Sequence, residues 1–327
     1  MTSTEALDLV SLADLRAAYE RIRPIARVTP LVEVPWPVSP APAGVGPLFL
    51  KCENLQPMGA FKIRGAVNML RQIPAADLAR GVITYSSGNH GQAVALAARE
   101  LGIPAVIVMP TTAPTVKVEG ARGYGAEVLF EGTMSAHRKA RAEALAAERG
   151  LTIVPPFDHP WIIAGQGTAG LEILEQEPDV ETVYVEVGGG GLLSGVSAAI
   201  KQLRPGVRLV GVEPVGAPKM SRSLAAGHPV TLEATASIAD GLMPVRPGDL
   251  TFAHTRAFVD EVVTVPDEAI ERAVAWIFRN GRVVAEPSGA ATIAALALGL
   301  GGPVGRTVAI VSGGNVAPEL FARLIAG

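Results

Sequence analysis

The chain has 327 residues, of which 49% are hydrophobic and 18% are charged. This length and composition predict a globular protein with a large core, arranged in two lobes. A formal net charge of −3 gives no electrostatic reason to expect nucleic acid or an anionic membrane as the main partner. No apolar run reaches the roughly 18 residues that a membrane span needs, and the single cysteine, Cys52, excludes an intrachain disulfide. We therefore expect a cytoplasmic protein whose partner is a small molecule.

The predicted elements alternate between short β-branched strands and alanine-rich helices, which is typical of parallel βαβ units. A first strand is expected in GPLFLKCE, after a loop rich in Pro, Ala and Gly at residues 35–47. Further strands are predicted at residues 81–85, 105–109, 127–131, 151–154, 182–187, 208–213 and 307–311. Because these strands are continuously apolar, both faces of their sheets should be covered by helices. The pattern predicts an α/β fold.

The stretch Met58 to Ala66 places Lys62 between an aromatic and an aliphatic neighbour. Apolar surroundings lower the pKa of a lysine, which frees the amine to act as a nucleophile or a base. A lysine that extends along the surface is the alternative, and Lys62 considered alone favours it. A phosphate-binding site elsewhere in the chain reverses that preference, because a phosphorylated aldehyde cofactor requires both features.

Open parallel sheets bind ligands at the carboxyl ends of their strands. The loops at these ends are the sequences SSGNHG, GGGG, EPVGA and SGGN, which begin at Ser86, Gly188, Glu213 and Ser312. Four consecutive glycines let backbone N–H groups approach a ligand, and the helix that follows favours an anion such as phosphate. A dinucleotide site is disfavoured because Leu193 and Ser194 interrupt the GxGxxG spacing. A tight turn without a ligand is the other alternative.

Motifs from about Pro30 to Asn315 resemble those of one known family, in the family's order. They are Glu53 to Gln56 with Gly59 to Ala66, Ser86 to Gln92, Ile163 to Thr168, Gly188 to Gly191, Ser237 to Gly241, Glu286-Pro287 and Ser312 to Asn315. The family is the serine/threonine dehydratases and serine racemases, pyridoxal-phosphate enzymes of the tryptophan synthase β-like fold (fold type II). The resemblance implies a two-lobed homodimer, with parallel sheets flanked by helices. The small domain would span residues 81–158, and the large domain residues 1–80 and 159–327.

The resemblance also implies the residues that bind pyridoxal 5'-phosphate. Lys62 would hold the cofactor as a Schiff base and later remove the Cα proton of the substrate. Phe61 would flank the ring, Asn89 would hydrogen-bond its hydroxyl, and Ser312 would meet its nitrogen. The phosphate would lie against the backbone of Gly188, Gly189, Gly190, Gly191 and Leu192.

The substrate carboxylate would be surrounded by Ser86, Ser87, Asn89 and His90. In the racemases, the serine at the position of Ser87 faces the lysine across the cofactor, so Ser87 is a candidate second catalytic residue. A hydroxyl that only binds the carboxylate or caps a helix is an equally supported interpretation.

The implied reaction is the α,β-elimination of a β-hydroxy amino acid such as L-threonine or L-serine, giving a 2-oxo acid and ammonia. A neutral hydroxyl at Ser312 does not stabilise a protonated ring, which favours elimination over a long-lived carbanion. Serine racemase activity is the main alternative. A β-replacement enzyme and a nucleotide-binding oxidoreductase are less well supported by the motifs.

Two departures from the family pattern bear on ligands. Glu213 and Ala217 match a divalent-metal loop of the racemases, but Lys219 stands where a second acid is expected. Its ammonium would repel a cation and could pair with Glu213 instead, so we expect no magnesium or calcium there. The apolar run Leu242 to Pro244 leaves room for a larger substrate. The chain ends one helix after Asn315, so we expect no C-terminal regulatory domain.

Overall fold

The computed structural model describes residues 8–38, 40–41, 43–86, 88–302 and 305–326. Its strands form two sheets, a six-stranded one in the order β1-β2-β10-β7-β8-β9 and a four-stranded one in the order β5-β4-β3-β6. Neighbouring strands of these sheets run parallel, except that β1 is antiparallel to β2. The strands are β1 (Leu31–Val34), β2 (Leu48–Lys51), β3 (Val82–Tyr85), β4 (Ala105–Met109), β5 (Glu127–Phe130), β6 (Thr152–Ile153), β7 (Thr182–Glu186), β8 (Arg208–Pro214), β9 (Glu261–Val265) and β10 (Thr307–Ile310).

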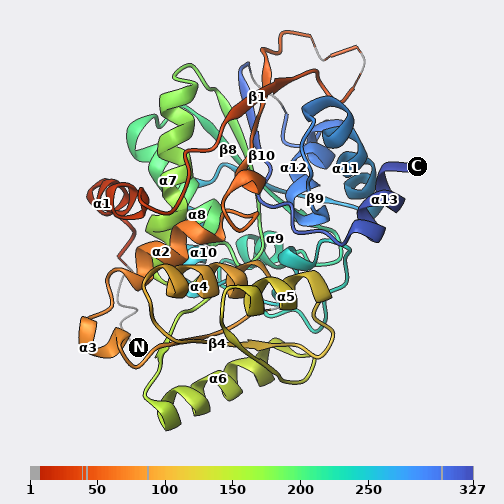
Figure 1. Cartoon of the computed structure of the whole chain (residues 1–327). Coiled ribbons are helices and arrows are strands. Elements are labelled where there is room, and N and C mark those ends of the chain that lie inside the picture. Colours follow the sequence, from red (N-terminus) through yellow and green to blue (C-terminus); the bar gives the residue numbers. More distant parts are fainter. Residues whose placement is uncertain (1–7, 39, 42, 87, 303–304, 327) are drawn as a thin grey trace.

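Helices cover both faces of both sheets. In Figure 1, α7 and α8 lie on one side of the larger sheet and α11 and α12 on the other, while α4 and α5 face α6 across β4. The helices are α1 (Leu12–Ile22), α2 (Lys62–Leu70), α3 (Ala75–Leu78), α4 (Asn89–Glu100), α5 (Thr115–Gly123), α6 (Ser135–Arg149), α7 (Pro160–Gln176), α8 (Gly191–Leu203), α9 (Lys219–Ala226), α10 (Asp249–Phe258), α11 (Asp267–Gly281), α12 (Pro287–Ala297) and α13 (Pro318–Ala326). Two 3-10 turns are η1 (Glu53–Leu55) and η2 (Asp240–Leu242). Within the residues that the structure describes, no helix is long and apolar enough to span a membrane.

The seven strands predicted from residue 81 onward are confirmed to within one residue at either end, and the strand predicted in GPLFLKCE is confirmed over its central residues Leu48–Lys51. Two strands, β1 and β9, were not predicted. They are the two edge strands of the larger sheet, and only some residues of each are buried. A half-buried edge strand lacks the continuous apolar run on which the prediction depended.

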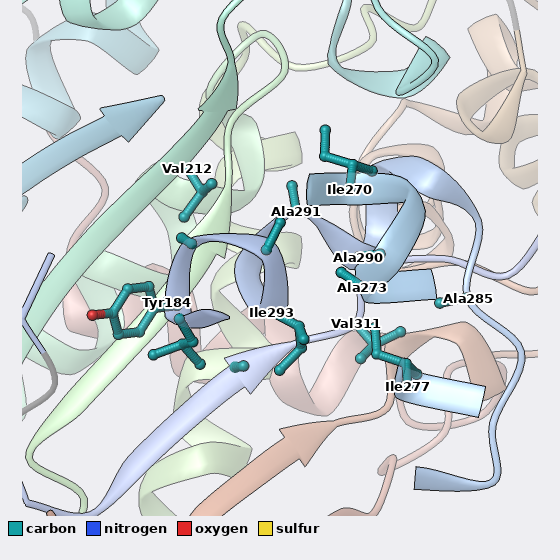
Figure 2. Close-up of a cluster of buried hydrophobic side chains, with 14 of the residues drawn as sticks. Tyr184, Val212, Ile270, Ala273, Ile277, Ala285, Ala290, Ala291, Ile293 and Val311 are labelled. Carbon is teal, nitrogen blue, oxygen red and sulfur yellow. The ribbon is translucent and has the colours of Figure 1, made fainter. Parts of the chain in front are cut away.

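The alanine-rich α12 shows how closely helices approach the larger sheet. Figure 2 shows Ala290, Ala291 and Ile293 of α12 between strand residues such as Tyr184 and Val212 and residues of α11. A helix that is apolar on all sides is stable only when it is packed on all sides, as α12 is here.

A buried network of charges fixes the helix that begins at Lys62. Arg64 Nε lies 2.7 Å from Glu53, and Arg64 Nη1 lies 2.6 Å from Glu172 on α7. Lys51 Nζ lies 2.6 Å from the same Glu172. Two cations thus balance two carboxylates, which a buried cluster requires. The network ties α2 to α7 and to the end of β2.

Candidate active site

Lys62 is the first residue of α2 and is partly buried. Its Nζ donates a hydrogen bond to the carbonyl oxygen of Pro156 at 2.7 Å. Loss of solvation on burial lowers the pKa of Lys62 from 10.5 to about 8. Much more of this amine is therefore uncharged near neutral pH than for a lysine in water.

The glycine run links β7 to α8 and has no room for side chains. A Cβ on Gly189 would overlap the Phe157 ring, and one on Gly190 would lie 2.8 Å from Thr251 Cβ. Gly190 also has a φ of 99°, in the left-handed region that favours glycine. Because α8 begins at Gly191, its first N–H groups have no partner within the helix and attract an anion.

The segment 156–158 connects the lysine to the glycine run. Pro156 supplies the carbonyl that Lys62 contacts, and the next residue, Phe157, places its ring against Gly189. Asp158 fixes the segment, since its Oδ1 accepts the N–H groups of Leu250 at 3.0 Å and Thr251 at 3.1 Å. Residues 62 and 189 are thereby brought together. Pro156 and Phe157 were not predicted as site residues, although they follow a predicted strand at its carboxyl end.

Ser312 is hydrogen-bonded to the residue that precedes the lysine. Its carbonyl oxygen accepts the Phe61 N–H at 3.0 Å, and Ala60 forms an isolated β-bridge with Gly313. The residue proposed to meet the ring nitrogen is thus hydrogen-bonded to the neighbour of the proposed Schiff-base lysine.

Asn89 is the first residue of α4 and uses both ends of its amide. Its Nδ2 donates to Glu286 Oε1, and its Oδ1 accepts from Asn315 Nδ2 at 2.9 Å. Ser86 Oγ accepts the Gly88 N–H at 3.1 Å, which shapes the turn into the helix. The start of α4 therefore lies beside the loop that contains Ser312. Ser87 lies outside the described residues.

His90 is buried next to Lys62. Its Nε2 lies 3.1 Å from the carbonyl oxygen of Val154, and its Nδ1 has no partner among the described residues. Burial, with the nearby charge of Lys62, lowers the pKa of His90 to about 3. The imidazole is neutral near pH 7, and its single N–H at Nε2 donates to the Val154 carbonyl oxygen, which leaves Nδ1 as an acceptor. In this state the ring offers a carboxylate neither a charge nor an N–H.

Lys117 was not predicted as a site residue, yet it reaches this region from α5. Its Nζ lies 2.6 Å from Asp240 Oδ2 and 3.1 Å from Glu286 Oε2. Burial acts to lower the pKa of Lys117, but the two carboxylates outweigh it and raise the pKa above its ordinary value. The ion pairs connect α5, which packs with the four-stranded sheet, to loops of the larger sheet.

Comparison with known proteins identifies the family. Residues 22–313 match the sequence pattern described as "Pyridoxal-phosphate dependent enzyme". The chain belongs to this family. It is 40% identical to an L-threonine ammonia-lyase of Thermotoga maritima over 97% of this chain and 78% of that protein. It is 38% identical to a serine racemase of Schizosaccharomyces pombe over 98% of this chain and 99% of that one.

Comparison with solved structures supports the same family. A structure of maize serine racemase superposes with a TM-score of 0.91 and 38% identity, covering 98% of both chains. The predicted α/β fold of type II and the predicted pyridoxal-phosphate cofactor are confirmed.

The residues of the site fit this cofactor. Lys62 offers an amine of depressed pKa to the aldehyde, and the bare glycine backbone with the start of α8 suits the phosphate. Ser312 offers a hydroxyl for the ring nitrogen. When bound, pyridoxal phosphate supplies a ring that withdraws electrons from the substrate Cα.

The uncharged amine of Lys62 gives capture of the cofactor a distinct pH dependence. With a pKa of about 8, about a tenth of the amine is uncharged at pH 7 and most of it at pH 9. The rate at which cofactor-free protein captures pyridoxal phosphate should rise about tenfold over this range and then level off, as followed by stopped-flow absorbance. A capture rate that still rises above pH 10 would show that Lys62 has the pKa of a lysine in water.

Adding a methyl group to the glycine run should weaken phosphate binding. In Gly189→Ala, the new Cβ meets the Phe157 ring, and overpacking of this kind costs about 1–3 kcal/mol. We expect the Kd for pyridoxal phosphate to rise about tenfold or more, as measured by fluorescence titration. Gly206→Ala is the matched control, because a Cβ there meets no atom within 4 Å. Equal affinities in the two variants would contradict the assignment.

The predicted replacement of a metal by Lys219 is supported by its contacts. Lys219 Nζ donates to the carbonyl oxygens of Val187 at 2.7 Å, Leu242 at 3.0 Å and Ala217 at 3.1 Å, and lies 3.3 Å from Glu213 Oε2. Three carbonyl acceptors and a carboxylate are ligands of the kind that a divalent cation takes. The ammonium occupies their centre, so these residues do not fit a metal ion.

Proposed function

We propose that the chain is an ammonia-lyase that converts L-threonine or L-serine into a 2-oxo acid and ammonia by α,β-elimination. The observation that carries the proposal is the convergence of Lys62 and the bare glycine run through Pro156 and Phe157. The similarity to an L-threonine ammonia-lyase over 97% of the chain supports the choice of reaction.

Each group has a task in this reaction. The uncharged Nζ of Lys62 takes the proton from the substrate Cα, and the Pro156 carbonyl orients that amine. The N–H groups at the start of α8 hold the cofactor phosphate, and those at the start of α4 hold the substrate carboxylate. The hydroxyl then leaves from Cβ and takes up a proton, so that water is lost overall. The enamine product tautomerises to an imine, and hydrolysis of this imine releases the 2-oxo acid and ammonia.

Two measurements test the proposal. Borohydride reduction of the purified protein, followed by peptide mapping, should place the cofactor on Lys62. Ammonia release from L- and D-serine, L- and D-threonine and hydroxyaspartate should then show the highest kcat/KM with an L-β-hydroxy amino acid. Labelling of another lysine, or absence of ammonia from every substrate, would contradict the proposal.

Racemase activity is a second candidate, supported by the similarity to a serine racemase over 98% of the chain. Inversion requires a second base opposite Lys62, and the candidate is Ser87. Chiral chromatography of serine recovered during turnover distinguishes the two reactions. D-serine formation that is lost in Ser87→Ala, with dehydration retained, would establish both activities.

The remaining proposals follow from the family resemblance and the composition. We infer a homodimer with a small domain at residues 81–158, located in the cytoplasm. Sedimentation velocity tests the dimer, and limited proteolysis tests the boundaries.

A further inference from the structure

Lys117 of α5 is a buried lysine that lies against the turn leading into α4. Its residue is 2% exposed, and α5 packs against α4. A Cβ on Gly88 would lie only 2.4 Å from Lys117 Cδ, so the aliphatic part of the lysine passes directly against the backbone of this turn. The turn ends at Asn89, where α4 begins. Lys117 therefore supports the helix start that is proposed above to bind the substrate carboxylate.

The ammonium of Lys117 reaches a loop that borders the glycine run. Its Nζ donates to Asp240 Oδ2 at 2.6 Å. The next residue, Gly241, lies so close to the run that a Cβ on Gly188 would be 2.8 Å from the Gly241 carbonyl oxygen. The Gly241 N–H donates to Ser288 Oγ at 2.9 Å, which fixes this loop against α12. Lys117 thus connects the turn before α4 to the loop beside the glycines that are proposed to hold the phosphate.

The same ammonium lies beside Glu286, which is 1% exposed. Lys117 Nζ is 3.1 Å from Glu286 Oε2, and Glu286 Oε1 accepts from Asn89 Nδ2. The backbone N–H of Glu286 donates to the Gly313 carbonyl oxygen at 3.0 Å, so Glu286 is fixed to the loop that contains Ser312. A buried carboxylate requires a nearby cation, and Lys117 supplies it. The lysine therefore links the start of α4 to a second loop of the proposed cofactor site.

We propose that Lys117 is a positioning residue, which holds the start of α4 in place against the loops of Asp240 and Glu286 so that its N–H groups are aimed at the carboxylate of a bound amino acid. Helix N–H groups attract an anion only over a short distance, and a displacement of about 1 Å can weaken a positioned contact severely. Lys117 acts through this placement, and no bond to it is made or broken. The inference rests on the proposed function for the place of the carboxylate.

The test compares the binding of L-alanine and L-alanine amide to the holoenzyme, followed by the absorbance of the cofactor. L-alanine has no β-hydroxyl, so it binds without being dehydrated, and its amide has no carboxylate. Lys117→Met removes the ammonium but keeps an unbranched side chain against Gly88. The Kd for L-alanine should rise about tenfold, as for the loss of a charge-assisted hydrogen bond. The Kd values for L-alanine amide and for pyridoxal phosphate should hardly change, because Lys62 and the glycine run are unaltered.

A matched control is Lys139→Met, which removes an exposed lysine of α6 whose Nζ lies 3.8 Å from Glu143 of the same helix. It should change none of the three affinities. If Lys117→Met does not fold, Asp240→Ala replaces it, because Asp240 is partly exposed and its loss removes one ion pair only. It should raise the Kd for L-alanine about threefold and leave that for the amide unchanged. The inference is overturned if L-alanine binds as tightly as to the unchanged protein, or if alanine and its amide are weakened equally.

These results separate the inference from the proposed function. Ammonia release from L-threonine or L-serine, together with equal losses for alanine and its amide in Lys117→Met, would overturn the role of Lys117 alone. A selective loss of L-alanine binding in a protein that releases no ammonia from any β-hydroxy amino acid would overturn the proposed reaction and retain the role of Lys117. An unchanged protein that binds neither compound would overturn both.

Discussion

Replacement of Lys62 by alanine is expected to lower kcat for ammonia release by about a thousandfold or more. The side chain has two roles in the proposed reaction, as the covalent anchor and as the base at Cα, and a positioned base alone contributes about 10²–10⁴. The variant should still bind pyridoxal phosphate, because the glycine run and Ser312 are unchanged, but borohydride should leave no label on the unfolded chain.

Two additions make this test specific. Lys62→Arg keeps the positive charge but has no nucleophilic amine, and we expect it to be as inactive as the alanine variant. A small primary amine added to Lys62→Ala should recover part of the activity by supplying the missing base. A residual kcat within tenfold of the unchanged protein would show that another group removes the Cα proton.

Replacement of Lys219 by alanine should have the largest effect on stability. It removes the buried ammonium and leaves Glu213 and three carbonyl oxygens around an empty space. Removing one partner of a buried ion pair costs about 3–5 kcal/mol. We expect the lower end, because Glu213 keeps the N–H groups of Met220 and Ser221. Urea unfolding of the two proteins measures the difference.

The same variant should gain a cation site. Calcium, which takes carboxylate and carbonyl oxygens, should stabilise Lys219→Ala by about 2.7 kcal/mol at a hundredfold excess over its Kd. It should not stabilise the unchanged protein, in which the ammonium holds the position. Lys201→Ala is the control, since its partner Asp260 is partly exposed and the loss should be below about 1 kcal/mol. Calcium that stabilises all three proteins equally would contradict the assignment.

Lys219 illustrates how a single side chain can adapt a shared fold. Its ammonium lies among three carbonyl oxygens and the carboxylate of Glu213. It thereby provides the positive charge that a bound ion would provide, without dependence on the ion's concentration.

The sequence by itself determined most of the strands and pointed to the loops that are proposed to bind the ligand. The apolar runs predicted seven strands to within one residue, because parallel strands buried on both faces must be continuously hydrophobic. The order of motifs pointed to Lys62, the glycine run and Ser312, since loops after parallel strands meet at one edge of a sheet.

Only the tertiary structure decided which groups act on one another. Phe157 meets Gly189, Lys117 meets Asp240, and Glu186 meets Ser312, and each pair joins residues that are distant in the sequence. Local propensity and periodicity depend on neighbours within a few positions, whereas desolvation and hydrogen bonding depend on distance in space. The depressed pKa of Lys62 and the raised pKa of Glu186 are therefore consequences of the folded structure, because burial produces both.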